Sequence, residues 1–428
     1  MKRVAIATLG CKTNQFESAA MIEQFRQEGY AVVPFTQPAD IYVVNSCTVT
    51  SRTDAETRRL IRRARRLNPE ARIVATGCYA QVAPDELLQL PELDNVLGNR
   101  EKRGITGHIE AGVNLVSDIA QAPGNETLHL ETFAEHTRAF LQVQNGCDSF
   151  CSYCIVPYAR GRSRSVPLAT ALGEVERLAA NGYHEIVLTG IHLGGYGLDL
   201  TPQASLTALV RSVDAGRLVS RVRIGSVEPN EVSAELLELM TRSDRICPHF
   251  HLPLQSGSDT VLRRMGRQYD AASFAELVTR IKHQLPHAFI GADVIAGFPG
   301  ESDEEHKETL RLIENLPLSD LHIFPYSRRN GTRAAAMAGQ VPPAVIKMRS
   351  EELRRLAAGK LKIFLEEQRG QTLQVLVQGF DQAESICRGI SANYVNVRFP
   401  GADDMVGKLV SVCIDTASDT LASGKALM

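Results

Sequence analysis

The chain has 428 residues, nine cysteines and a formal net charge of −2 at pH 7. This length allows several domains with separate cores, and the balanced charge excludes a basic surface over the whole molecule, so any nucleic-acid contact must be local. No apolar run reaches the roughly 18 residues of a membrane span, and the start, Met1–Gly10, turns polar too soon for a signal peptide. We therefore expect a cytoplasmic protein whose reduced thiols bind metal.

Residues 1–115 alternate short apolar runs with polar, helix-forming stretches, which is typical of a parallel α/β sheet. Three of the runs end at a cysteine: Cys11, Cys47 and Cys78. Because the carboxyl ends of parallel strands share one edge, where ligands bind, these thiols are expected to converge. Three in register favour an iron–sulfur cluster over three small apolar residues that close strands.

A helix is predicted over 51–67, with seven arginines against two acidic residues. Leu60, Ile61, Ala64 and Leu67 supply its inward face. A solvated charged face is the ordinary interpretation, but the imbalance favours contact with a phosphate backbone. The mixed polar residues 116–137, which include Gly and Pro, are predicted to form a linker.

Within residues 138–368, six predicted strands alternate with helical stretches, which favours a partial (βα)6 barrel with its reactive groups at the carboxyl ends of the strands. The predicted strands are 140–144, 185–189, 221–226, 249–254, 289–296 and 321–326. Cys147 follows the first strand, as this geometry requires. A helix rich in Lys and Arg is predicted over 342–368.

Cys147, Cys151 and Cys154 have the spacing C-x3-C-x2-C. Three thiolates so spaced can hold three irons of a [4Fe–4S] cluster and leave the fourth iron open to a small molecule. The alternatives are buried structural thiols or a zinc site, but zinc prefers four ligands in paired C-x2-C units, and no second such pair exists. The remaining cysteines show no such pattern and are interpreted as core or incidental thiols; they are Cys247, Cys387 and Cys413.

Residues 369–428 change to short predicted strands, at 373–377, 385–388, 394–398 and 408–413. They suggest a small β-barrel, a shape often used to bind RNA or oligonucleotides. Phe380, Tyr394 and Phe399 are its only aromatic platforms, so this segment alone indicates RNA binding weakly.

The three-part α/β plan and several motifs resemble the radical S-adenosylmethionine (SAM) methylthiotransferases over essentially the whole chain. The motifs are LGCKTNQ at 9–15, NSCTVT at 45–50, TGCYAQ at 76–81, the run 147–157, LPLQSGS at 252–258 and GFPGE at 297–301. The carboxyl-terminal segment is similar to the family's RNA-binding TRAM domain. Two departures are mild: Ser46 stands where threonine is common, and Thr189-Gly190-Ile191 replaces an acidic Gly-Gly-Glu.

This resemblance implies two [4Fe–4S] clusters. The cluster on Cys147, Cys151 and Cys154 would cleave SAM reductively, and the resulting radical would remove hydrogen from an unactivated carbon. The cluster on the first cysteine triplet would carry the sulfur to be inserted, and a second SAM would supply the methyl group. No catalytic side chain beyond the cluster ligands is expected.

Seven residues are expected to bind SAM: Tyr153, Gly190, Glu228, Gln255, Ser256, Gly297 and Gly300. Tyr153 would lie against the adenine, and Glu228 would bind ribose hydroxyls. The alternatives are packing for the tyrosine, a helix cap for the glutamate, and plain turns for the last two glycines.

Some members of this family modify a tRNA adenosine beside the anticodon, and this adenosine carries either an isopentenyl or a threonylcarbamoyl group. Other members modify an aspartate of a ribosomal protein. GCKTNQFES at 10–18 and PYARGRSRS at 157–165 look most like the threonylcarbamoyladenosine (t6A) branch. The t6A carboxylate could be received by Arg160, Arg162 or Arg164. The arginines expected to contact RNA are Arg58, Arg62, Arg65, Arg66, Arg160, Arg162, Arg164, Arg328 and Arg329.

The implied partners are the tRNA anticodon stem-loop, a reductant such as flavodoxin or ferredoxin, and a sulfur donor; a monomer is adequate. Two alternatives stay open. One is a family member that acts on isopentenyladenosine or on the ribosomal-protein aspartate. The other is a non-catalytic Fe–S protein that binds RNA, which predicts no cleavage of SAM.

Overall fold

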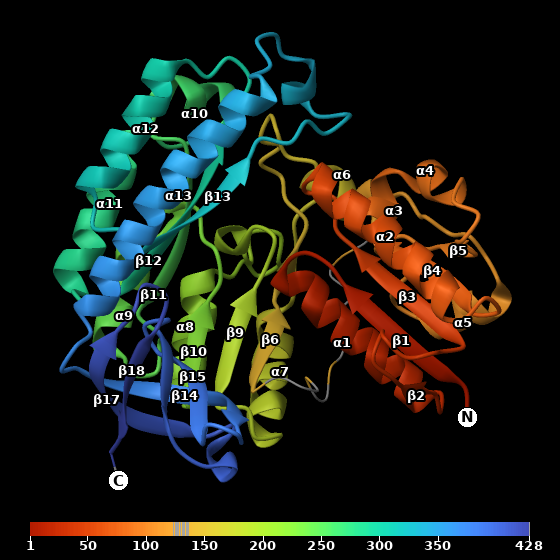
Figure 1. Ribbon diagram of the computed structural model, residues 1–428, viewed down its shortest axis with the longest axis horizontal. Coiled ribbons are helices and arrows are strands. Elements are labelled where there is room, and N and C mark those ends of the chain that lie inside the picture. Colours follow the sequence, from red (N-terminus) through yellow and green to blue (C-terminus); the bar gives the residue numbers. More distant parts are fainter. Residues whose placement is uncertain (123, 125–127, 129, 131–132, 134–136, 428) are drawn as a thin grey trace.

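The structure is a computed structural model, and it describes residues 1–122, 124, 128, 130, 133 and 137–427. Figure 1 shows three parts: an amino-terminal domain in red and orange, a central core, and a small blue barrel at the carboxyl-terminal end. The remaining residues of the predicted linker, 116–137, lie outside what the structure describes. No helix among the described residues is long and apolar enough to cross a membrane.

The amino-terminal domain has a five-stranded parallel sheet in the order β2-β1-β3-β4-β5. Its strands are β1 (Arg3–Thr8), β2 (Ala31–Val32), β3 (Ile41–Ser46), β4 (Arg72–Gly77) and β5 (Asn95–Val96). Its helices are α1 (Lys12–Gln27), α2 (Ser51–Leu67), α3 (Cys78–Val82), α4 (Pro84–Leu88) and α5 (Ile105–Ala111). Every residue of β3 is buried, as expected for a central parallel strand covered on both faces.

Helix α2 begins and ends where the sequence predicts. The Thr50 side chain accepts a hydrogen bond from the Thr53 backbone N–H, and the Thr53 hydroxyl completes a capping box, so the first turn is well satisfied. Leu60, Ile61 and Ala64 are buried against the sheet. The arginines therefore lie on the remaining faces of the helix.

The core contains six parallel strands that form two three-stranded sheets, β10-β9-β6 and β11-β12-β13. Isolated parallel bridges, Val222 to Ile246 and Ser226 to His251, join the two sheets. The strands are β6 (Arg138–Gln142), β9 (Glu185–Thr189), β10 (Arg221–Ile224), β11 (His249–Gln255), β12 (Phe289–Ala296) and β13 (Asp320–Pro325). The predicted partial (βα)6 barrel is confirmed.

Helices cover the outside of this barrel, as Figure 1 shows for α11, α12 and α13 on the side away from the amino-terminal domain. The outer helices are α7 (Leu168–Ala180), α8 (Leu206–Ala215), α9 (Ala234–Arg242), α10 (Asp259–Met265), α11 (Ala271–Gln284), α12 (Asp303–Asn315) and α13 (Pro343–Glu366). Short elements shape its loops: η1 (Ile119–Gln121), β7 (Gln144–Asn145), α6 (Val156–Arg160), β8 (Arg164–Ser165), η2 (Leu193–Gly195), η3 (Pro229–Glu231) and η4 (Arg333–Ala336).

The carboxyl-terminal segment is a closed barrel in the order β14-β15-β16-β18-β17, which confirms the predicted small β-barrel. Its elements are β14 (Thr372–Asp381), β15 (Ile386–Ser391), β16 (Asn396–Pro400), η5 (Asp403–Met405), β17 (Leu409–Ala417) and β18 (Ala422–Ala426). Strand β18 is not among the predicted strands, because its small residues have low strand propensity. This strand closes the barrel by pairing with both β16 and β17.

The small barrel docks at the amino-terminal ends of the core strands through two arginines. Arg221 donates to the carbonyl oxygen of Ile390 (2.9 Å), and Arg223 donates to that of Ser391 (3.0 Å). Both arginines also contact Glu185, at 2.6 and 2.9 Å, and all three side chains are at most 4% exposed. Burial opposes the charge of Glu185, but the arginines outweigh it and lower its pKa to about 2.

Candidate active site

The first cysteine triplet lies at one edge of the amino-terminal sheet. Cys11, Cys47 and Cys78 follow β1, β3 and β4, which are neighbours in the sheet. Gly10, at φ +100°, permits the close approach, because a Cβ there would lie 2.9 Å from the Cys47 Sγ. At φ +96°, Gly77 is similar: a Cβ would clash with the backbone beside it.

Electrostatics shows how closely these thiols are grouped. Burial, together with the neighbouring Cys78 and Cys11, raises the pKa of Cys47 to about 11. Cys47 and Cys78 are 7% and 8% exposed, whereas Cys11 is exposed. Three cysteines grouped at one sheet edge are suited to an iron–sulfur cluster, which binds them as thiolates and neutralises their charge.

A cation from the core reaches into this group. Arg160, at the end of α6, is 1% exposed, and its Nε lies 3.2 Å from the Cys78 Sγ. Its two terminal nitrogens bind Glu17 and Asn14 of α1, and Lys102 also binds Glu17. The side chain thus crosses from the core to the amino-terminal domain and is fully engaged there.

The second triplet lies in a loop that follows β7. Gly146, at φ +73°, starts the loop, and a Cβ there would clash with the carbonyl group of Arg162. The Ser152 N–H donates to the Met265 carbonyl (2.8 Å), and the Ala334 N–H donates to the Ser152 carbonyl (2.7 Å). The loop is therefore held between the carboxyl-terminal end of α10 and η4.

Polar side chains contact two sulfurs of this loop. The Arg267 Nη1 lies 3.2 Å from the Cys151 Sγ, and Arg267 is paired with Glu228. Burial opposes ionisation of Cys147, but hydrogen bonds from His192 and Ser149 lower its pKa. Burial also raises the pKa of Cys154 to about 12. Like the first triplet, these thiols suit a metal cluster that takes them as thiolates.

A cavity of about 190 Å³ lies between the loop of the second cysteine triplet and the segment that follows Cys47. On the core side it is lined by Cys154 and its neighbours and by the ends of β11, β12 and β13. On the other side it is lined by Val49 and Thr50, which follow Cys47 closely in the chain. The remaining lining residues are Tyr153, Ile155, Val156, Gln255, Asp293, Ile295, Phe324, Pro325, Tyr326 and Ser327.

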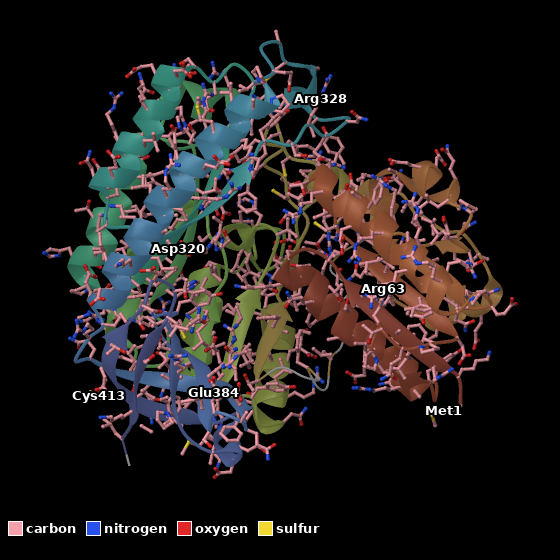
Figure 2. The ribbon with its side chains drawn as sticks, in the orientation of Figure 1. Met1, Arg63, Asp320, Arg328, Glu384 and Cys413 are labelled. Atoms are coloured by element: carbon pink, nitrogen blue, oxygen red, sulfur yellow. The ribbon has the colours of Figure 1, made fainter. Side chains whose placement is uncertain are left out.

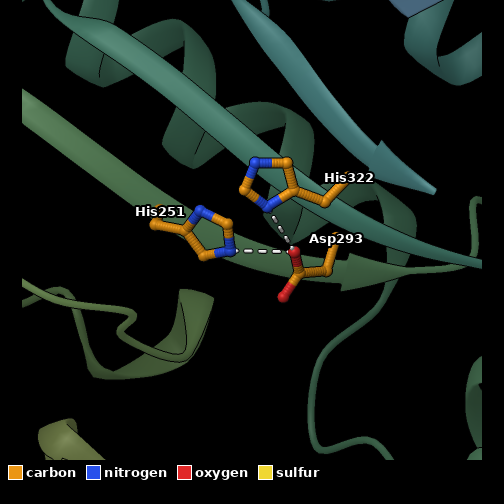
Figure 3. A group of neighbouring side chains, drawn as sticks. All are labelled: His251, Asp293 and His322. Atoms are coloured by element: carbon orange, nitrogen blue, oxygen red, sulfur yellow. Dashed lines mark hydrogen bonds and ion pairs between the residues drawn. The ribbon is translucent and has the colours of Figure 1, made fainter. Parts of the chain in front are cut away.

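Asp293 is the one carboxylate in this cavity, and two histidines orient it (Figure 3). One carboxylate oxygen, Oδ1, contacts the His251 Nε2 at 2.8 Å and the His322 Nδ1 at 3.3 Å. Burial opposes its charge, but the two hydrogen bonds outweigh burial and lower the pKa of Asp293 to about 2. Its other oxygen has no hydrogen bond within the described part of the chain and is free to accept one from a bound ligand.

The sequence analysis did not identify Asp293, His192 or Arg267. Asp293 did leave a signal, since it is the one charged residue in the apolar strand β12. His192 directly follows the Thr189-Gly190-Ile191 departure noted above. Arg267 lies in a polar turn and had no distinguishing pattern.

Only some of the seven expected SAM-binding residues lie at the cavity. Tyr153 and Gln255 line the cavity. Glu228 instead pairs with Arg267, so it acts behind Cys151 rather than in the cavity. The backbone beside Gly190 donates to Gln144, through the N–H groups of residues 191 and 192 at 2.9 and 2.8 Å.

Three other expected SAM-binding residues do not line this cavity, and their contact with SAM stays a prediction. Ser256 is fully buried and bonded to Thr309 of α12 (3.3 Å). A Cβ on Gly297 would clash with Ile346 of α13. The Gly300 N–H donates to the Gly339 carbonyl (2.7 Å). Both glycines have positive φ, +78° and +75°, so turns and close approach to SAM both remain open for them.

Acids from other segments pair with three arginines of α2, which a count within the helix could not show, and a fourth arginine pairs with Glu56 of the helix itself. The ion pairs join Arg58 to Glu86, Arg59 to Glu56, Arg62 to Glu92 and Arg65 to Asp94. Arg66 is exposed and has no ion pair within the described residues. Exposed pairs exchange readily with other partners, so RNA contact by this helix stays a prediction.

Three arginines expected to contact RNA have partners inside the protein, and RNA contact by them stays a prediction. Arg160 is buried as described, and Arg164, 9% exposed, donates to the Arg160 carbonyl at 2.9 Å. Arg329 pairs with Asp54 of α2 at 2.6 Å. Arg162 is largely exposed beside Asp148, and Arg328 is exposed where the segment after β13 approaches the amino-terminal domain (Figure 2).

Comparisons with known proteins agree with this division of the chain. Residues 3–98 match the family described as "Uncharacterized protein family UPF0004", and residues 141–313 match the "Radical SAM superfamily". Among solved structures, the radical S-adenosylmethionine methyltransferase TsrM from Kitasatospora setae superposes with a TM-score of 0.57 over 78% of this chain and 77% of that chain. At 16% identity, this likeness shows the fold alone.

Full-length relatives are much closer in sequence. The threonylcarbamoyladenosine tRNA methylthiotransferase MtaB of Bacillus subtilis is 41% identical, over 97% of this chain and 94% of that protein. The protein of the same name from Aquifex aeolicus is 39% identical, over 96% and 100%. A tRNA-2-methylthio-N(6)-dimethylallyladenosine synthase from Pelotomaculum thermopropionicum is 33% identical, over 97% and 96%.

Proposed function

Because this chain belongs to the radical SAM methylthiotransferases, in the branch of the threonylcarbamoyladenosine tRNA enzymes, we propose that it adds a methylthio group to carbon 2 of t6A beside the tRNA anticodon. The single observation that carries the proposal is the cavity that Cys154 lines on one side and Val49 and Thr50, which follow Cys47, line on the other. A reaction that joins a SAM-derived radical, a sulfur atom and a nucleoside needs all three within a few ångströms of one another.

The thiols of both triplets fit iron, as their grouping and burial indicate. The second triplet, Cys147, Cys151 and Cys154, would hold one [4Fe–4S] cluster. The first triplet, Cys11, Cys47 and Cys78, would hold another. Bound there, the clusters and SAM would supply the electron, the hydrogen-abstracting radical, the sulfur and the methyl group.

The side chains of the cavity would hold and orient SAM. The free oxygen of Asp293 can accept a hydrogen bond from a ribose hydroxyl, and Gln255 can both donate and accept. Tyr153 and Tyr326 offer aromatic faces to an adenine ring. The apolar lining around them excludes water from the reacting atoms.

The t6A carboxylate needs a cation near the first triplet. Of the three arginines suggested by the sequence, only Arg162 is exposed. Lys12 is a further candidate: it directly follows Cys11, is half-buried, and has no hydrogen bond or ion pair in the described parts of the chain. Burial and the charges of Arg138 and Arg223 lower the pKa of Lys12, against the opposing charges of Tyr394 and Glu185. We assign the carboxylate to Lys12 and Arg162.

Dimethylallyladenosine is the second candidate substrate. The observation that favours it is the apolar character of part of the cavity, where Val49, Ile155 and Ile295 could receive a hydrocarbon group. The ribosomal-protein aspartate has no comparable support. A reductant such as flavodoxin or ferredoxin, a sulfur donor, action as a monomer and a cytoplasmic location complete the proposal.

The test is an anaerobic assay with the reconstituted protein, reductant, sulfide and SAM. One reaction contains tRNA that carries t6A, and the other contains tRNA that carries dimethylallyladenosine. Digested nucleosides are analysed by mass spectrometry, and 5′-deoxyadenosine is measured in parallel. We expect the 2-methylthio derivative of t6A, and a Cys151→Ala variant should produce neither nucleoside product nor 5′-deoxyadenosine.

The outcomes separate the candidates. If only the tRNA with dimethylallyladenosine gave a methylthio product, that nucleoside would be the substrate instead of t6A, and the proposed radical methylthiolation would stand. Cleavage of SAM with neither tRNA product would point to the ribosomal-protein substrate. No cleavage by protein with verified clusters would leave the non-catalytic RNA-binding alternative.

A further inference from the structure

Arg160 belongs to the core by sequence and to the amino-terminal domain by contact. Its helix, α6, begins two residues after Cys154, yet its Nε lies 3.2 Å from the Cys78 Sγ of the other triplet. The side chain is 1% exposed. One arginine therefore extends from next to the radical SAM loop to a ligand of the proposed sulfur-carrying cluster.

The surroundings fix the direction of its Nε–H bond. The two terminal nitrogens of Arg160 bind Glu17 and Asn14, which leaves Nε to face Cys78. Lys102 shares Glu17 with Arg160, so two buried cations stand against one buried carboxylate. All three charged side chains are at most 3% exposed. The group keeps one surplus positive charge beside the first triplet.

The backbone near Arg160 is also tied to this domain. The Asn99 Nδ2 donates to the carbonyl oxygen of Ala159 at 2.8 Å and lies 3.9 Å from the Cys78 Sγ. Helix α6 is therefore anchored on both sides of the Cys78 sulfur. Movement of the core away from the amino-terminal domain would have to break the contact between Arg160 and Cys78.

We propose that Arg160 donates a hydrogen bond to the Cys78 thiolate of the cluster on the first triplet and raises the reduction potential of that cluster. The same contact holds the core against this cluster. The inference rests on the proposed function, because it requires a cluster on Cys11, Cys47 and Cys78. Hydrogen bonds to cluster sulfurs are a main determinant of cluster potential. A positive charge stabilises the more negative, reduced state, and its effect is large here because burial removes the screening by water.

The radical SAM triplet has a matching contact. Arg267 Nη1 lies 3.2 Å from the Cys151 Sγ, and Glu228 pairs with that arginine as Glu17 pairs with Arg160. Each triplet therefore has one cysteine sulfur in contact with an arginine whose charge is partly offset by a glutamate. Arg160 differs because it comes from the other domain.

The test measures the cluster on the first triplet, Cys11, Cys47 and Cys78, by itself. A full-length background chain with Cys147→Ala, Cys151→Ala and Cys154→Ala removes the other cluster, and iron and sulfide analysis verifies the one that remains. An anaerobic redox titration then compares this background with the same chain carrying Arg160→Gln, Arg160→Lys or Glu17→Gln. The readout is the midpoint potential of the cluster, which needs neither tRNA nor turnover.

The two glutamine variants should shift the potential in opposite directions. Arg160→Gln removes a cation and an N–H donor, so we expect at least a tenfold lower ratio of reduced to oxidised cluster at a fixed potential, or about 59 mV for one electron. Glu17→Gln removes a negative charge and should raise the potential. Arg160→Lys keeps the charge and loses the Nε–H, so it should give a smaller decrease.

A purely structural role predicts a different result. Both glutamine variants disturb the same buried group, so shifts of equal sign, or no shift, would overturn the inference. If Arg160→Gln binds no iron, the Arg160→Lys and Glu17→Gln potentials decide in the same way. A background chain that binds no iron would overturn both the proposed cluster on the first triplet and this inference. A cluster that forms but keeps the same potential in every variant would overturn this inference alone.

Discussion

Arg329 of the core and Asp54 of the amino-terminal domain form an ion pair of 2.6 Å beside the cavity, with side chains only 12% and 10% exposed. Thr48 joins the pair, because its hydroxyl contacts both partners. Thr48 directly follows Cys47, so the pair connects the segment after β3, which carries Cys47, to the segment after β13. This relationship leads to a prediction about coupling between the two halves of the site.

Arg329→Met should uncouple cleavage of SAM from formation of the nucleoside product. Loss of the pair leaves Asp54 without its cation, which loosens the apposition of the two domains but leaves the radical SAM loop intact. The ratio of 5′-deoxyadenosine to methylthio product should rise severalfold above that of the wild type. Lys347→Met, which removes an exposed cation in a pair of 3.9 Å, is the matched control. An unchanged ratio in Arg329→Met would contradict the prediction.

The two cysteine triplets should separate the two halves of the reaction. Cys47→Ala should keep SAM cleavage and lose the methylthio product, whereas Cys154→Ala should lose both, since only the second triplet is proposed to hold the cluster that binds SAM. Each variant should lose about half of the iron of the reconstituted protein. Iron analysis and the two product assays check this, and cleavage by Cys154→Ala would contradict it. Cys413→Ala, which changes a thiol outside both triplets, should resemble the wild type.

Gly77→Ala should impair the first triplet selectively. At φ +96°, its Cβ would clash with the backbone at Ser46, next to Cys47, so Cys78 would be displaced. We expect loss of most of the iron at this site while SAM cleavage persists. Gly104→Ala is the matched control, since it also has positive φ, at +69°, but nothing within 4 Å of the new Cβ. Equal iron contents in the two variants would contradict a steric cause.

Lys12→Gln should lower the modification of t6A more than that of dimethylallyladenosine, because only t6A carries a carboxylate for the ammonium to bind. The loss should appear as at least a tenfold lower kcat/KM for t6A tRNA, with little change in SAM cleavage. Lys2→Gln removes an exposed lysine of the same domain and serves as the control. Equal losses for the two substrates would show that Lys12 does not read the carboxylate.

Glu185 should make the docking of the small barrel sensitive to acid. The buried arginines lower its pKa from 4.5 to about 2. A group with a lowered folded pKa stabilises the fold fully above its unfolded value, and this contribution is lost as pH falls from 4.5 toward 2. The contribution near neutral pH is on the order of 3 kcal/mol. Denaturation followed by circular dichroism at pH 7 and pH 3 should show a smaller pH effect in Glu185→Gln than in the wild type. An equal pH effect in both proteins would exclude Glu185 as its source.

Local patterns were enough to predict much of this molecule. The spacing of Cys147, Cys151 and Cys154 is a contiguous signal, and the alternation of apolar and polar runs predicted both α/β units and their strands. The strands at 185–189 and 289–296 agree with the structure residue for residue. Such features depend on residues that are close in the chain.

The missed features depend on partners far away in the chain. Arg160 reads as a free cation in PYARGRSRS, and only the fold brings Glu17, 143 positions earlier, against it. The charge of α2 was overestimated for the same reason, since three of its arginines pair with acids from other segments. Strand β18 has no apolar pattern and exists because closing the barrel gives its backbone partners on both sides.

The docking of the small barrel places it at the opposite end of the core from the cavity. Strand β12 spans the core between these ends with eight residues, or about 26 Å at 3.3 Å per residue. An RNA that touches the small barrel while its adenosine occupies the cavity must bridge that height, which a single nucleoside cannot do. RNA binding by the small barrel would therefore favour a folded stem with its loop over a free nucleoside, because only the longer ligand could reach both places.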